Sequence, residues 1–198
     1  GERVRIPRGL CRKLISTGPR EFTLHARNPE RSVVFGGNAT VFSPVGGPPF
    51  VSDLDGGRRY GTLDDFHRLV KLTHQLAPLH HSGFVTCEPC DIPVSKRHLD
   101  MLLAHMTLTD KPHLGAITEK SRAEDSVAMA RLLHGPEGFD SHCVILGNVN
   151  TNSPLLVDKV VTEAAEVYCG AGQGLIAVPF ILSGAMGPVT TAAAIAQA

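Results

Sequence analysis

The 198-residue sequence lacks an excess of charge of either sign, because 19 basic residues balance 19 acidic ones. Partners such as nucleic acid or an anionic membrane surface usually require concentrated positive charge, so neither class gains support. A long apolar run is also missing. The longest, residues 174–189, is interrupted by Pro179, Gly184 and Gly187. It is too short and too broken for a membrane span.

Cysteines are few and unsuited to a disulfide framework. There are five, an odd number without regular spacing, and the N-terminus shows no signal-peptide pattern. We therefore expect a cytoplasmic protein with free thiols. Cys87 and Cys90 form a CxxC pair, but neither a second such pair nor an HxxxH spacing accompanies it. Two incidental thiols are favoured over zinc or redox chemistry, and no metal site is expected.

Common catalytic signatures are absent as well. The sequence contains no serine nucleophile elbow, no P-loop and no HExxH motif. Local motifs therefore do not define a reaction.

The first 61 residues have a β-type pattern. Short strand-like runs alternate with turn residues, at residues 21–27, 32–35, 39–43 and 49–53. The sequence GGN at 36–38 predicts a tight hairpin between the second and third runs, whereas residues 53–59 are typical of a loop. Residues 1–61 are thus predicted to form a small hairpin-rich N-terminal segment.

After residue 61, helix and strand patterns alternate. Apolar strands are predicted at 83–87, 113–118, 141–147 and 175–180. Helices are predicted at 62–79, 94–106, 121–135, 153–170 and 188–198, the first four with caps at Thr62 (with Asp65), Ser95, Ser121 (with Glu124) and Ser153. Continuous apolar strands indicate a parallel sheet covered on both faces.

The spacing of these strands predicts part of a β/α (TIM) barrel. Their centres lie near Phe84, Leu114, Val144 and Ile176, at intervals of 30, 30 and 32 residues. A barrel of eight units averages about 31 residues per unit. Four βα units cannot close such a barrel, so residues 62–198 are interpreted as its first half in a truncated chain. A doubly wound sheet, or a complete open sheet of four strands, is the alternative.

Functional groups in parallel β/α units gather after the carboxyl ends of the strands. Asn148, Asn150 and Ser153 lie in the predicted loop after the third strand. Their polar groups can orient a small ligand, although Asn152 or Ser153 could instead cap the following helix.

Acidic residues occupy the neighbouring loops. Glu88 and Asp91 follow the first strand and Glu119 follows the second, which would suit a cationic ligand. Solvent exposure, or pairing with helix N-termini, explains them equally well. Lys120 could act as a Schiff-base amine in an aldolase or lyase, with a solvated lysine as the alternative.

A family resemblance covers nearly the whole chain. It is carried by FTLHARNPERSVVFGGN, FSPVGGPPFVSDLDGGRRYGTLDDF, EPCDIP, LTDKPHLG, NTNSPL and GAMGPVTTAAAIA, in that order. These segments resemble the trimethylamine methyltransferase family, whose longer members have a β/α barrel as their body.

The resemblance implies an enzyme that moves a methyl group from a methylated amine to the cobalt of a separate corrinoid protein. The substrate would be trimethylamine or a quaternary amine such as glycine betaine, and no cofactor would be bound directly. The protein could also form a homo-oligomer. The resemblance does not identify a catalytic residue in this sequence. A barrel lyase and a non-catalytic module that binds methylated amines remain alternatives.

Aromatic residues are scarce, which bears on how a cation could be held. Eight Phe, two Tyr and no Trp make a full aromatic cage doubtful within this chain. The acidic residues and asparagines are therefore the preferred candidates. Asp53 joins them if the N-terminal segment folds over the barrel mouth, although a turn before Gly56 also accounts for it.

Overall fold

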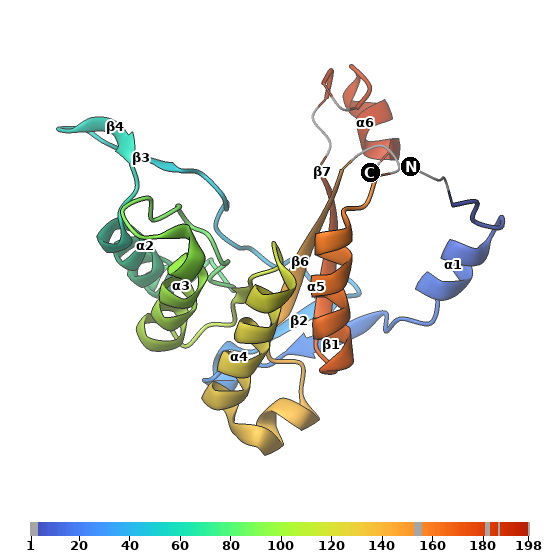
Figure 1. The fold of residues 1–198 in the computed structure, drawn as a ribbon, viewed down its shortest axis with the longest axis horizontal. Coiled ribbons are helices and arrows are strands. Elements are labelled where there is room, and N and C mark those ends of the chain that lie inside the picture. The colour runs from blue at the N-terminus through green and yellow to red at the C-terminus, as the bar shows by residue number, and fades with distance from the viewer. Residues whose placement is uncertain (1–3, 153–155, 181–182, 186, 198) are drawn as a thin grey trace.

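The computed structural model describes residues 4–152, 156–180, 183–185 and 187–197. It is a mixed α/β structure in which antiparallel hairpins precede parallel βα units (Figure 1). The N-terminal elements are α1 (Leu10–Ile15), β1 (Glu21–Leu24), η1 (Pro29–Arg31), β2 (Val33–Gly36), β3 (Phe50–Asp53) and β4 (Gly57–Tyr60). They are followed by α2 (Leu63–Gln75), α3 (Val94–Leu108), β5 (Leu114–Gly115), α4 (Lys120–Ser141), β6 (Leu146–Asn152), α5 (Lys159–Gly170), β7 (Gly174–Phe180) and α6 (Thr191–Gln197).

A parallel sheet with the order β5-β6-β7 organises the second part of the chain. Helices α4 and α5 cover one of its faces (Figure 1). Between sheet and helices lies a buried cluster that includes Phe139, Ile145, Ala164 and Tyr168. Burying this apolar surface is the main force that holds the helices on the sheet. Within the described residues the sheets do not close into a barrel.

The prediction of a strand at 83–87 is wrong. The chain there runs beside β5 in the same direction, because the Ser82 amide donates to the Pro112 carbonyl at 2.9 Å and the Leu114 amide donates to the Gly83 carbonyl at 3.0 Å. Pairing then stops, since the Phe84 carbonyl accepts from His105 Nε2 at 2.8 Å and the Val85 carbonyl accepts from the Gly47 amide at 2.8 Å. These partners replace the ladder that a strand requires.

Residues 42–48 run alongside this irregular segment on its other side. The amides of His80 and His81 donate to the Phe42 carbonyl, and the Glu88 amide donates to the Pro48 carbonyl at 2.9 Å. Part of the N-terminal segment is therefore hydrogen-bonded into the wall formed by the βα units.

The hairpins differ from those predicted. Strand β2 pairs back with β1, with Phe22 opposite Phe35, so the predicted hairpin across 36–38 is wrong. Gly36 and Gly37 both have positive φ, which turns the chain away from the sheet after β2. The stretch expected to be a loop instead forms the β3–β4 hairpin, in which Val51 lies opposite Arg59.

One of the four predicted helix caps is confirmed. Thr62 and Asp65 form a reciprocal capping box at the start of α2. Ser95 and Ser121 do not cap, because α3 begins at Val94 and α4 at Lys120, two residues earlier than those caps require, and neither helix has a side-chain cap. Helix α5 begins at Lys159 after Asp158, later than the predicted start at residue 153, and Ser153 itself lies outside the described residues.

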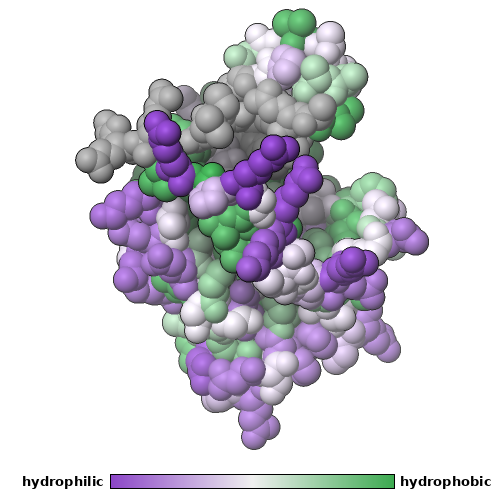
Figure 2. Space-filling view, turned by 90° about the vertical axis from the view of Figure 1, so that its right-hand side faces the viewer, coloured by the Kyte–Doolittle hydropathy of each residue, from purple (hydrophilic) through white to green (hydrophobic). Residues whose placement is uncertain are grey.

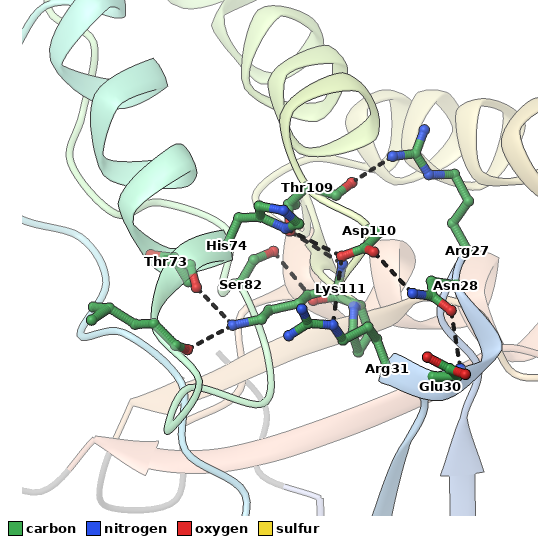
Figure 3. A network of polar contacts seen from close by, with 12 residues as sticks. Arg27, Asn28, Glu30, Arg31, Thr73, His74, Ser82, Thr109, Asp110 and Lys111 are labelled. Atoms are coloured by element: carbon green, nitrogen blue, oxygen red, sulfur yellow. Dashed lines mark hydrogen bonds and ion pairs between the residues drawn. The ribbon is translucent and has the colours of Figure 1, made fainter.

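Polar contacts fix the β1–β2 hairpin below the helices (Figure 3). Asn28 Nδ2 donates to Asp110 Oδ2 at 3.1 Å, while His74 Nδ1 lies 3.2 Å from Asp110 Oδ1. The buried Lys111 Nζ donates to the carbonyls of Thr73 and Leu76, at the end of α2. The lysine thus satisfies carbonyls that the end of a helix leaves without partners.

Helix α1 projects from the body and has no buried residue (Figure 1). Figure 2, which views that side, shows hydrophobic residues bordered by long hydrophilic side chains. Leu14 and Ile15 are among the exposed apolar residues. Across the described ranges, no helix has both the length and the apolarity needed to cross a membrane.

Candidate functional site

The inner face of the parallel sheet is the face turned away from α4 and α5. Two pairs of neighbouring residues on β6 and β7 lie on it. Asn148 lies opposite Ile176, and Asn150 lies opposite Val178. Thr118, which follows the end of β5 at Gly115, lines the same cavity as both asparagines. Because side chains alternate along a strand, both asparagines share this inner face.

A cavity of about 650 Å³ lies against the inner face. Both asparagines line it, together with Thr118, Ile176 and Val178. Its other walls come from α3, from residues 83–88 and from the N-terminal segment, including Ser43, Pro44, Gly46 and Gly47. The volume suits a small ligand.

Asn148 and Asn150 were predicted as loop residues, and this placement is wrong. Both belong to β6, where period-two spacing gives their amides one common direction. Asn148 is half-buried and Asn150 is exposed on the cavity side. Ser153, predicted beside them, lies outside the described residues.

Glu88 lines the cavity and is committed to an ion pair. Its Oε2 lies 3.2 Å from Arg97 NH1, and Arg97 NH2 donates to the Ile92 carbonyl at 3.1 Å. Arg97 therefore orients the carboxylate and holds the loop that follows residue 88.

Three other acidic candidates lie outside the cavity lining and have structural partners. Asp91 Oδ1 accepts from the Leu63 amide at 2.9 Å, at the start of α2. Asp53 accepts from the amides of Asp55 and Gly56, which shapes the exposed β3–β4 turn. Glu119 Oε2 lies 3.2 Å from Arg122 Nε.

Thr118 and Arg122 form a polar group next to the asparagines. Both line the cavity, and Arg122 NH1 donates to Thr118 Oγ1 at 3.5 Å. Lys120, the candidate Schiff-base residue, lies outside the lining, with its Nζ 3.9 Å from Glu124 Oε1. Its side chain is well exposed, as expected for a solvated lysine.

Buried histidines lie in and next to the cavity wall: His81 lines the cavity, and His105 is buried outside the lining. Burial, followed by the neighbouring His113, lowers the pKa of His81 to about 3, and the same two causes lower the pKa of His105 to about 3. His98, on the cavity wall, bonds through Nε2 to Asp125 Oδ2 at 2.8 Å.

The CxxC pair is not arranged as a reactive or metal-binding centre. Burial, followed by the nearby Asp65, raises the pKa of the Cys87 thiol to about 11. Cys90 is exposed, and both thiols are free. Throughout the part of the chain that the structure describes, no group of three metal-ligating side chains comes together.

Sequence reasoning missed Arg97 and Arg122 as cavity residues. Both lie in the first turns of helices, where the sequence pattern predicted only serine caps. A usable signal existed for the asparagines, because alternate spacing is typical of one strand face.

These features place the chain among α/β proteins in which one face of a parallel sheet lines a cavity. The sequence pattern of the trimethylamine methyltransferase (MTTB) family matches residues 1–198, and the chain belongs to that family. It is 39% identical over 193 residues to the glycine betaine methyltransferase of Desulfitobacterium hafniense (strain Y51). The match covers 97% of this chain and 40% of that relative.

Proposed function

We propose that the protein transfers a methyl group from a methylated amine to the cobalt of a separate corrinoid protein in the cytoplasm. Family membership supports the reaction, and the relative named for glycine betaine supports a quaternary amine as substrate. The observation that carries the proposal is structural: Asn148 and Asn150, together with Ala116 and Thr118, line a cavity of about 650 Å³.

We further propose that residues 62–198 form four βα units of a β/α barrel, with residues 1–61 as the segment that precedes it. The order β5-β6-β7 and the parallel hydrogen bonds of Ser82 and Gly83 beside β5 support this arrangement. In it, the inner face described above becomes part of the barrel interior.

The proposed reaction sets two requirements for the cavity, which follow from the bonds that break and form. The C–N bond breaks with its electron pair remaining on nitrogen, and a C–Co bond forms on a reduced cobalt. A quaternary amine leaves as a neutral amine without needing a proton. The protein must hold the ammonium group and orient one methyl towards the partner. The amide oxygens of Asn148 and Asn150 supply the negative partial charge that a methylated ammonium group prefers.

The test uses the full-length protein with a reduced corrinoid protein and either trimethylamine or glycine betaine. We expect methylcobalamin to form, as measured from the cobalamin absorption spectrum. Replacing Asn150 by Ala should lower kcat/KM by about tenfold or more, because a contact made to the reacting amine is lost. Asn38→Ala, in an exposed loop, is the matched control and should leave kcat/KM unchanged.

Two outcomes would contradict the proposal. One is the absence of methylcobalamin with every tertiary and quaternary amine tested. The other is equal activity in the Asn150→Ala and Asn38→Ala proteins, which would remove the inner-face asparagines from the substrate site.

A further inference from the structure

The charges around the cavity do not balance. Arg97 and Arg122 line it, whereas Glu88 is the one carboxylate among the described lining residues. Glu88 is already paired with Arg97 at 3.2 Å. The guanidinium group of Arg122 therefore leaves the wall with a positive charge that no lining carboxylate offsets.

The partners of Arg122 occupy only part of its guanidinium group. Nε lies 3.2 Å from Glu119 Oε2, and NH1 lies 3.5 Å from Thr118 Oγ1. Glu119 stands outside the cavity lining with its side chain 57% exposed, so solvent weakens this pair. A guanidinium group has five N–H donors, and within the described residues these are its hydrogen-bond and ion-pair partners. Donors thus remain for an anionic group.

Arg122 lies beside the polar inner face. Thr118, which accepts from Arg122, lines the same cavity as Asn148 and Asn150. The cavity consequently has a cationic side chain next to neutral amides that can accept contacts from a cation. A ligand with positive charge alone is repelled by Arg122, whereas a carboxylate matches the planar fork of its guanidinium.

We propose that Arg122 is a specificity-determining residue that selects methylated amines bearing a carboxylate. In this arrangement the carboxylate binds the Arg122 guanidinium, and the ammonium group lies beside Asn148 and Asn150. The inference rests on the proposed function for the identity of the ammonium group, and it adds which amines the site accepts.

The test compares two ligands that differ at one end. Glycine betaine carries a carboxylate where choline carries a hydroxymethyl group, and both have the same trimethylammonium group. Binding of each to the full-length protein is measured by titration calorimetry, and turnover is measured with the reduced corrinoid protein. We expect glycine betaine to be favoured over choline by about 10- to 100-fold, the range for a charge-assisted hydrogen-bonded pair.

Variants of the same helix sharpen the comparison. Arg122→Gln should reduce the preference to within about threefold, chiefly by raising KM for glycine betaine, while choline binding is unchanged or improves because the repulsion from Arg122 is removed. Arg122→Lys keeps the charge without the fork and should retain part of the preference. Arg131→Gln is the matched control. Arg131 NH1 lies 2.7 Å from Asp140 Oδ1, outside this cavity, and its replacement should change the binding of neither ligand.

The outcomes separate this inference from the proposed function. Equal affinity for glycine betaine and choline would overturn the role of Arg122 even if methyl transfer occurs. The same holds if the Arg122→Gln protein loses affinity for both ligands to an equal extent. Selective binding of glycine betaine that depends on Arg122, without any methyl transfer, would support the inference and contradict the reaction. Circular dichroism of each variant identifies loss of folding.

Discussion

At the scale of single residues, Asp65 joins the β3–β4 hairpin to the first turn of α2. Asp65 Oδ2 accepts from the Thr62 amide at 2.9 Å, and Asp65 Oδ1 accepts from Arg59 NH2 at 2.8 Å. The hydrogen bond from Arg59 is the largest cause that holds the pKa of Asp65 well below its usual range. This carboxylate is thus ionised in the folded protein at any pH near neutrality.

Asp65→Asn should destabilise the protein by about 1–2 kcal/mol, because it removes the charge from a buried cap and from the Arg59 pair. The loss should shrink as pH falls below about 4, where the unfolded aspartate takes up a proton. Urea unfolding at several pH values measures both effects. Asp64→Asn is the control, since the Asp64 side chain is 67% exposed in its pair with Arg68. Equal losses in the two variants would contradict the role of Asp65.

At the scale of elements, close packing of α5 on the sheet depends on small residues. A Cβ atom on Gly147 would lie 2.7 Å from Ile117 Cδ1, 2.9 Å from Leu175 Cδ2 and 3.0 Å from Tyr168 Cδ2. Tyr168, on α5, is fully buried and donates from its hydroxyl to the Ala116 carbonyl at 2.8 Å. The outer face of β6 therefore has no space for a side chain at this position.

Gly147→Ala should lower the free energy of unfolding by about 1–3 kcal/mol, the usual cost of overpacking a core. Thermal or urea unfolding provides the measurement. Gly170→Ala, at the end of α5, is the comparison because its added Cβ meets no atom within 4 Å. If the two substitutions had the same effect, the tight contact between β6 and α5 would be disproved.

The elements also show how far sequence patterns reach. Apolar periodicity and glycine stops predicted the helices now seen at α2, α3, α4 and α5, and the apolar run that became β7. The prediction of a strand at 83–87 was wrong because His105 and Gly47, which are distant in sequence, form hydrogen bonds to the carbonyls of this segment. The asparagines were placed on the wrong type of element because polar residues in a strand were interpreted as a loop. Their part in lining the cavity depends on register, which local pattern does not specify.

At the scale of the whole molecule, buried histidines couple stability to pH. Burial is the largest cause that lowers the pKa of His81 and His105 to about 3 and of His113 to about 4. In the unfolded chain each histidine titrates near about 6.5. Below that pH the unfolded state binds protons that the folded state does not, so stability decreases as pH falls.

We expect the free energy of unfolding to fall between about pH 6.5 and pH 5, with a slope of up to about 1.4 kcal/mol per pH unit for each buried histidine. Urea unfolding across this range measures the slope, before the aspartates contribute at lower pH. His105→Gln removes one titrating group and should make the slope shallower. A stability that stays constant over this interval would show that these histidines are protonated in the folded protein.

The central claim is that the inner face of the parallel sheet holds a methylated amine. The most direct measurement is a crystal structure of the full-length protein with glycine betaine. The account predicts the ligand in the cavity, with its ammonium group beside Asn148 and Asn150. A ligand bound elsewhere, with these asparagines out of contact, would contradict it.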